Sequence, residues 1–212
     1  LDAVRRLLGR ARVSEHDLEC GPVDGSRLHH NCSGKHAGML LLARTRGWET
    51  AGYRLPEHPV QRAALAEVAD AADVPEDEVE TAVDGCGVVA FALPLERMAL
   101  AFSRFHERDG GDVVGGAMRA RPELVRGPEA PDTMLMRALP GWTAKGGAEA
   151  VFCAAGPDGL GVALKVEDGN ARALRPALAA FLGRLGHEVA EFHTSPLLNS
   201  RGEECGELVA RD

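Results

Sequence analysis

The stretch HHNCSGKHAGM at residues 29–39 brings a thiol, an ammonium group, an amide, a hydroxyl and three imidazoles into neighbouring positions. Asn31 or Ser33 could cap a helix over residues 34–46, because short polar side chains accept hydrogen bonds from the first backbone N–H groups of a helix. Lys35 would then lie in the first turn, where unpaired N–H groups favour anions. We therefore expect a reactive site where this helix begins.

Two further stretches carry reactive side chains among glycines. The loop VDGCGV at residues 83–88 offers the carboxylate of Asp84 and the thiol of Cys86, and TAKGG at residues 143–147 offers Lys145 at the start of a strand. Glycines permit the close backbone approach that a ligand requires. We expect both stretches to converge with the first one on a single site.

Lysine is scarce in this chain. Only Lys35, Lys145 and Lys165 are lysines among 24 basic residues. A lysine amine can lose its proton when buried and can then act as a base or a ligand, which arginine does poorly. We therefore expect functional roles for Lys35 and Lys145, and a structural role for Lys165 in the middle of a strand.

Composition excludes several classes of protein. With 212 residues, 45% of them hydrophobic, the chain can form a core of ordinary size. No run approaches the ~20 apolar residues of a membrane-spanning helix. The net charge is −8 and no basic tract is present, so nucleic acids and anionic membranes are poor partners.

The cysteines argue against a disulfide scaffold. They are odd in number and widely spaced, and no secretory signal precedes them, so reduced thiols in a cytoplasmic protein are expected. They are Cys20, Cys32, Cys86, Cys153 and Cys205.

Hydrophobic periodicity predicts helices in the first two thirds of the chain. Besides 34–46, the expected helical segments are 1–12, 60–72, a short one after Pro75, 95–105, 118–125 and 133–138, with a surface loop at 106–116. The pattern then changes to a strand at 143–155, a turn at 156–159, an antiparallel partner at 160–166, a helix at 171–185 and a last short strand within 196–208.

These elements predict an α+β fold with an antiparallel sheet. Three parts are expected. They are the remnant of an N-terminal helical or sheet part at 1–25, a mainly helical subdomain with both cysteine motifs at 26–139, and a hairpin sheet with a C-terminal helix at 140–212.

The residues alone leave the chemistry open. Cys32 and Lys35 at a helix start, with Cys86 in a glycine loop, could hold a soft divalent ion such as zinc. The spacing by itself favours two small buried hydrophobes, which free cysteines usually are. Asp84 could hold the amino group of a ligand, although an aspartate here more often caps a turn.

Lys145 has a clearer logic. The glycines Gly146 and Gly147 would let a substrate lie against the strand, a backbone N–H could face an oxyanion, and the lysine would tune a nearby nucleophile or proton. The histidines His29, His30 and His36 could serve a metal or act as a base, but single histidines are more often packed residues.

Three motifs resemble a known family. NCSGKHAGM at 31–39, DGCGV at 84–88 followed by FALPL at 91–95, and AKGGAE at 144–149 are similar in order and spacing to the rhizobial-type L-asparaginases, the asparaginase II family. LGVALKVEDG at 160–169 and RGE at 201–203 match as well. The resemblance spans essentially all of residues 1–212.

The resemblance implies an amidohydrolase that converts L-asparagine to L-aspartate and ammonia, on a fold similar to serine β-lactamases and glutaminases. It implies a zinc site of Cys32, Lys35 and Cys86, and a catalytic role for Lys145. Asp84 would hold the α-amino group of asparagine. With it, the expected substrate-binding residues are Asn31, Gly146 and Gly147. A homodimer is expected by analogy alone.

The family's nucleophilic Ser-x-x-Lys motif is not found in this sequence. The residues three positions before the lysines are Cys32, Trp142 and Val162. The resemblance therefore implies a fragment or truncated homologue that lacks the family's N-terminal third, its nucleophilic serine and its N-terminal strands. The alternatives are an inactive zinc- or asparagine-binding remnant, and a metallohydrolase that uses zinc-bound hydroxide with His36 as base.

Overall fold

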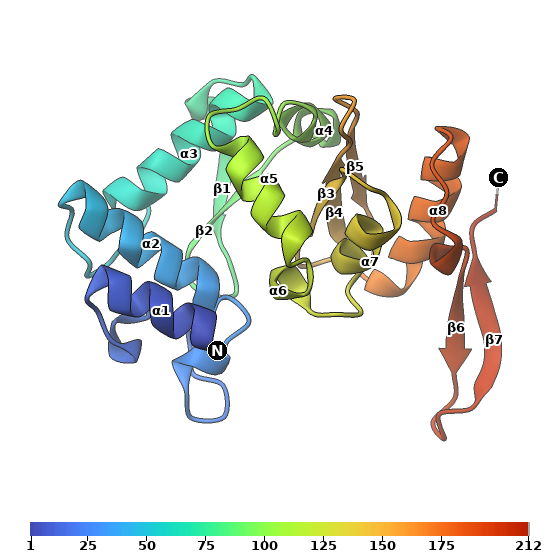
Figure 1. The fold of residues 1–212 in the computed structure, drawn as a ribbon, viewed down its shortest axis with the longest axis horizontal. Coiled ribbons are helices and arrows are strands. Elements are labelled where there is room, and N and C mark those ends of the chain that lie inside the picture. The colour runs from blue at the N-terminus through green and yellow to red at the C-terminus, as the bar shows by residue number, and fades with distance from the viewer. Residues whose placement is uncertain (212) are drawn as a thin grey trace. The chain divides into compact units, whose positions relative to one another are not determined.

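The computed structural model describes residues 1–211 (Figure 1). The chain forms two compact units, Leu1–Leu93 and Pro94–Asp212. Each combines helices with antiparallel strands, which confirms the predicted α+β class. The predicted division of the chain at residues 25 and 139 stays a prediction.

The first unit is a helical layer with one hairpin. Its elements are α1 (Asp2–Ala11), α2 (Ser33–Arg46), α3 (Pro59–Ala72), the strands β1 (Glu80–Val83) and β2 (Val89–Ala92), and the short 3-10 helices η1 (Glu15–Asp17), η2 (Arg27–His29) and η3 (Glu76–Glu78). The helices predicted at 34–46 and 60–72 are confirmed within one residue. The structure forms only the turn η3 where a short helix was expected after Pro75.

The sequence explains where α2 ends and what it packs against. Gly47 stops the helix in a left-handed conformation (φ 70°), which glycine adopts without a steric penalty. The buried side of the helix carries Ala37, Leu40 and Ala43 and packs on α1, which lies alongside (Figure 1). This core holds the start of α2, and therefore Cys32 and Lys35, in a fixed frame.

The second unit is built on a three-stranded antiparallel sheet of order β3-β4-β5. Its elements are α4 (Leu95–Ser103), α5 (Gly111–Ala120), α6 (Glu123–Arg126), α7 (Pro131–Ala138), β3 (Thr143–Gly146), β4 (Val151–Ala155), β5 (Gly161–Lys165), η4 (Ala171–Ala173), α8 (Leu174–Arg184), η5 (Ala190–Phe192), β6 (Thr194–Leu198) and β7 (Glu204–Val209). The core includes Leu135, Trp142, Phe152, Leu178 and Leu182.

The predicted single strand at 143–155 is wrong. The chain turns back on itself after Gly146, and β3 and β4 pair with Lys145 opposite Cys153. The turn residues Glu149 and Ala150 both have left-handed backbones, with φ of 53° and 54°. Asn-Gly or Asp-Gly usually marks such a turn. Because Glu-Ala is not such a turn sequence, the residue pattern predicted one continuous strand across the turn.

Other differences have similar causes. Residues 84–88 of the predicted loop lie between two paired strands, β1 and β2, which were not predicted, and Val83 ends β1. The predicted loop at 106–116 contains the start of α5, a glycine-rich helix of low intrinsic propensity. The tail forms the hairpin of β6 and β7 next to α8, in place of one short strand (Figure 1).

Within residues 1–211, no helix combines the length and the apolar character that crossing a membrane requires.

Candidate functional site

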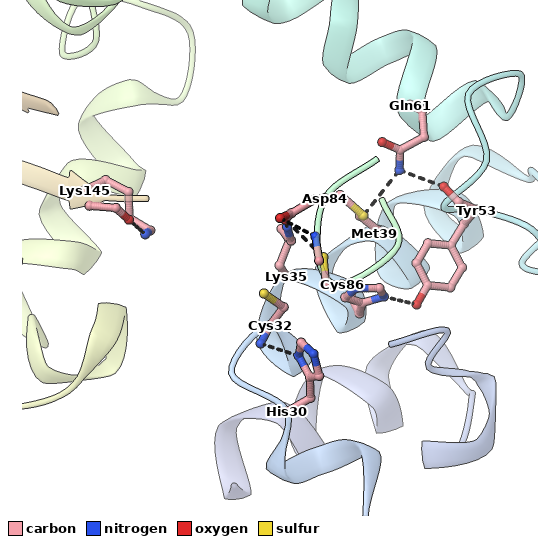
Figure 2. A network of polar contacts seen from close by, with 12 residues as sticks. His30, Cys32, Lys35, Met39, Tyr53, Gln61, Asp84, Cys86 and Lys145 are labelled. Atoms are coloured by element: carbon pink, nitrogen blue, oxygen red, sulfur yellow. Dashed lines mark hydrogen bonds and ion pairs between the residues drawn. The ribbon is translucent and has the colours of Figure 1, made fainter. Parts of the chain in front are cut away.

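The first unit brings the two cysteines of the predicted site together. Cys32 is the residue before α2, and Cys86 lies in the loop between β1 and β2, 54 positions further along the chain. One ligand atom from each of Cys32, Asp84 and Cys86 lies within 4.8 Å of the others (Figure 2). Cys86 is only 5% exposed, whereas Cys32 and Asp84 are half-buried. We call this set, with Lys35, the thiol cluster.

The loop places its side chains through its own hydrogen bonds. The Asp84 N–H donates to the Val88 carbonyl at 2.8 Å, and the Gly87 N–H donates back to the Asp84 carbonyl at 2.8 Å. Gly87 has a φ of 88°, a conformation that glycine adopts readily. The Gly85 N–H holds Asp84 Oδ1 at 2.7 Å, which leaves Oδ2 directed at the other groups of the cluster.

Lys35 and Asp84 form an ion pair at the edge of the cluster. Lys35 Nζ lies 3.0 Å from Asp84 Oδ2, and the Cys86 thiol donates to the same oxygen at 3.3 Å. The side chains of Lys35 and Asp84 remain 40% and 34% exposed. Water and small ligands can therefore reach these two charges.

The charges of the cluster compensate one another. Burial acts to lower the pKa of Lys35, but its contacts with Asp84 and Cys86 outweigh burial and raise that pKa. Burial acts to raise the pKa of Asp84, and the Lys35 and Cys86 hydrogen bonds bring it below its ordinary value. Burial raises the pKa of Cys32, against the pull of Lys35. The metal-free chain therefore pairs an ammonium with a carboxylate, and metal binding must displace protons.

The donor set fits a zinc ion. Two thiol sulfurs, one carboxylate and one amine are four groups of the number and softness that tetrahedral zinc takes. The predicted ligands Cys32, Lys35 and Cys86 are all in the cluster. Asp84, predicted to hold substrate, has a carboxylate oxygen within 4.8 Å of both sulfurs and could instead be a ligand. Asn31 is exposed in the turn that precedes α2.

A buried chain of hydrogen bonds lies beside the start of α2, and no sequence pattern indicated it. His36 is fully buried, with Nδ1 2.5 Å from the Tyr53 hydroxyl, which also accepts the Glu19 N–H at 2.8 Å (Figure 2). Burial lowers the pKa of His36 to about 4, so its ring is neutral. Because Tyr53 lies 17 positions from His36, no local pattern connects them.

His30 also has a local role. Its Nδ1 accepts the Cys32 N–H at 3.0 Å, which fixes the backbone at the first thiol (Figure 2). Two of the three histidines in the opening stretch thus serve the frame around the cluster. A weak signal for this was available, since single histidines are usually packed or capping residues.

The second unit holds the other predicted residues. Lys145 projects from β3, and its ammonium donates to the carbonyl of Gly146. The Gly146 N–H donates to Asp132 of α7, and the Gly147 N–H donates to the Val151 carbonyl at 2.8 Å. Both glycine N–H groups therefore have acceptors within the chain. Asp132 is a residue that sequence reasoning missed.

The predicted convergence of residues 143–147 with the two cysteine stretches stays a prediction. So do the roles given to the individual site residues.

Comparison with known proteins adds a family. The family model described as L-asparaginase II matches residues 1–210. The match includes the thiol cluster in the first unit and the strand of Lys145 in the second. No curated protein matches the chain.

Proposed function

The chain belongs to the L-asparaginase II family, and we propose that it is an amidohydrolase that takes L-asparagine and water to L-aspartate and ammonia. We further propose that its two units are parts of a fold like that of serine β-lactamases and glutaminases. The observation that carries the proposal is the thiol cluster, in which Cys32 meets Asp84 and Cys86, which are 52 and 54 positions further along the chain, within 4.8 Å. Two cysteines that served only as packing residues would not need a carboxylate within 4.8 Å of both sulfurs.

We propose that zinc is the resident metal and that Cys32, Lys35 and Cys86 hold it. A bound zinc ion would supply positive charge that orients and polarises a substrate group. The chain's own contribution is to keep the donors in place. The hydrogen bonds of the loop fix Asp84 and Cys86, and the His30 contact fixes Cys32.

Asp84 is the residue proposed to take the α-amino group of asparagine. Its carboxylate is ionised, about one third exposed and already paired with an ammonium group, that of Lys35. When Lys35 gives up its proton to bind metal, the carboxylate loses its partner. A second ammonium group, that of the substrate, could then replace it at the same oxygen.

Strand β3 is proposed to supply the amine of Lys145, which would transfer a proton, and a stretch of backbone against which the substrate would lie. Lys145 would tune a nucleophile or move a proton, as a lysine amine can. Because the N–H groups of Gly146 and Gly147 already have acceptors, we assign these glycines a steric role. At Gly147, which is half-buried, the missing side chain would let a substrate approach the backbone. At Gly146, which is buried, the missing side chain makes room for the guanidinium of Arg126.

These residues do not include a Ser-x-x-Lys nucleophile. The proposal therefore gives residues 1–212 the binding and proton-transfer roles. The alternative is a catalytically inactive family member that binds zinc, asparagine or both.

The test is to express the natural coding sequence from its own start codon through residue 212. Ammonia release is measured with L-asparagine and with L-glutamine as substrates. The zinc content of the protein is measured as well. We expect release from asparagine that Lys145→Met abolishes, while the control Lys165→Met, on the exposed end of β5, keeps it.

Each result has a distinct meaning. Zinc or asparagine binding without ammonia release would establish the alternative. A chain that binds neither zinc nor asparagine and releases no ammonia would overturn the proposal.

A further inference from the structure

The second unit contains a buried carboxylate that the proposed function does not use. Asp132 is the second residue of α7 and is fully buried. Its Oδ1 accepts the Gly146 N–H. Within residues 1–211 its Oδ2 has no hydrogen-bond partner, and the guanidinium of Arg126 lies 3.6 Å away. Burying such a group costs free energy, so its presence needs an explanation beyond stability.

Two side chains, those of Arg126 and Asp132, pack tightly around Gly146. A Cβ atom built at Gly146 would collide with Arg126 Nη1 and would lie 3.2 Å from Asp132 Oδ1. The side chain of Arg126 is 37% exposed, so its charge reaches solvent while its end covers the glycine. Gly146 is therefore held on one side by a carboxylate and covered by the cation that balances it.

The hydrogen bond from Gly146 acts on Lys145 through the backbone. The peptide plane between the two residues contains the Gly146 N–H, so holding this N–H fixes the plane and with it the ψ angle of Lys145. On the other side, Lys145 is held in register opposite Cys153 of β4. The Cα of Lys145 is thus fixed from both directions, although its side chain is long and flexible.

We propose that Asp132 is a positioning residue for Lys145, with Arg126 as its counter-ion. This role rests on the proposed function, in which the Lys145 amine handles a proton. An amine that must meet a substrate atom gains from a backbone that cannot rotate, because misplacement by about 1 Å can reduce a rate 100-fold. A carboxylate holds an N–H more strongly than a neutral acceptor does.

A simpler role for Asp132 makes a different prediction. An acidic residue in the first turn of a helix stabilises the helix through its dipole. Asp112 occupies the same kind of position in α5, where it is exposed. The variant Asp112→Ala is therefore a matched control, since it removes the dipole contribution alone.

The experiment compares Asp132→Ala, Asp132→Asn and Asp112→Ala in the natural chain. Hydrogen exchange of the Gly146 amide is followed by NMR beside that of Ala144 and Phe152. We expect Asp132→Ala to speed Gly146 exchange at least about 10-fold more than its neighbours. Asp132→Asn, which keeps an oxygen acceptor, should restore part of the protection and guards against a failure of Asp132→Ala to fold. Asp112→Ala should leave Gly146 unchanged relative to the same neighbours.

Kinetics give the second readout. We expect kcat for asparagine to fall about 10- to 100-fold in Asp132→Ala, with KM changed less than about threefold. A uniform rise in exchange across β3, or equal losses in kcat and in stability for Asp132→Ala and Asp112→Ala, would overturn the role. If the parent chain releases no ammonia, the proposed function fails, and Gly146 exchange still decides whether Asp132 holds this peptide.

Discussion

The thiol cluster of the first unit and the Asp132–Gly146 pair of the second unit use a carboxylate in opposite ways. Asp84 is about one third exposed and shared among Lys35, Cys86 and a backbone N–H. Asp132 is fully buried and accepts the Gly146 N–H, and the guanidinium of Arg126 lies 3.6 Å away. The first carboxylate can change partners at little cost, whereas the second cannot. The difference indicates a site for exchange in one unit and a site for fixed geometry in the other.

Energetics support this contrast. A partly exposed ion pair such as Lys35–Asp84 contributes about 0–1 kcal/mol to stability, so replacing Lys35 with another cation is cheap. Removing the buried carboxylate of Asp132 would leave the Gly146 N–H without its acceptor, which costs about 1–3 kcal/mol. The thiol cluster can therefore reorganise around a ligand, and the pair at Gly146 resists any such change.

The largest expected effect is the loss of zinc affinity at the thiol cluster. Cys86→Ala removes a buried thiol from the cluster, and we expect zinc affinity to fall at least about 100-fold, since even the loss of an outer-shell partner costs 10- to 100-fold. Competition with a chromogenic chelator measures the change. Cys205→Ala, at an exposed cysteine, is the control and should bind zinc as the parent does. Equal affinity in Cys86→Ala would remove Cys86 from the site.

The second effect concerns the buried thiol of Cys153 in the second unit. Burial raises the pKa of Cys153, opposite Lys145, to about 11 from its ordinary value of 9.0. The folded chain thus keeps this proton at a pH where the unfolded chain loses it. The contribution is fully present below pH 9 and is lost as pH rises through 11, up to about 2.7 kcal/mol in all.

Urea unfolding at pH 8 and pH 10.5 checks this expectation. The parent should lose more free energy of unfolding between the two pH values than Cys153→Ala, which has no thiol to ionise. A parent and variant that lose the same amount would show that Cys153 titrates normally.

The third effect concerns the hydrogen bonds that Tyr53 makes with Glu19 and His36. Tyr53→Phe leaves the Glu19 N–H and His36 Nδ1 without their shared hydroxyl, and we expect the free energy of unfolding to fall by about 1–3 kcal/mol. Thermal unfolding measures it. Thr45→Val removes an exposed hydroxyl that bonds the Leu41 carbonyl and should cost less than about 0.5 kcal/mol. Similar losses in both variants would contradict a supporting role for Tyr53.

The smallest expected effect tests backbone strain in the turn between β3 and β4 of the second unit. Glu149 is exposed and has a left-handed backbone with φ of 53°, so Glu149→Gly should stabilise the chain by about 1 kcal/mol. Ala148→Gly, next to it and exposed, is the control and should destabilise by about 0.5–1 kcal/mol. Chemical denaturation resolves the two signs. Destabilisation by both variants would show that the turn carries no relievable strain.

The sequence predicted those features that repeat over short distances. The helices at 34–46 and 60–72 followed from apolar periodicity and from their ends, where Gly47 and Pro59 stand. The hairpin of β3 and β4 was missed because its turn is Glu-Ala, without the residues that favour left-handed backbone. Local propensity could not report a conformation that packing imposes.

The candidate site divides in the same manner. The family, and the residues Cys32, Lys35 and Cys86 that we propose as zinc ligands, could be read from the motifs and their order. The closeness of Asp84 to both thiols, the hydrogen bond of Tyr53 to His36 and the hydrogen bond of Asp132 to Gly146 could not. Each of these brings together residues at least 14 positions apart, such as Cys32 and Asp84.

By itself the sequence therefore determined which chemical groups the protein has, where its main helices begin and end, and which family it resembles. Only the tertiary structure decided which charges meet and how deeply each is buried. The physical reason is the distance along the chain over which each interaction acts. Backbone propensities and caps act over a few residues, whereas the partner and the burial of a carboxylate depend on how distant segments pack. For Asp84 and Asp132, that packing made one exchangeable and the other fixed.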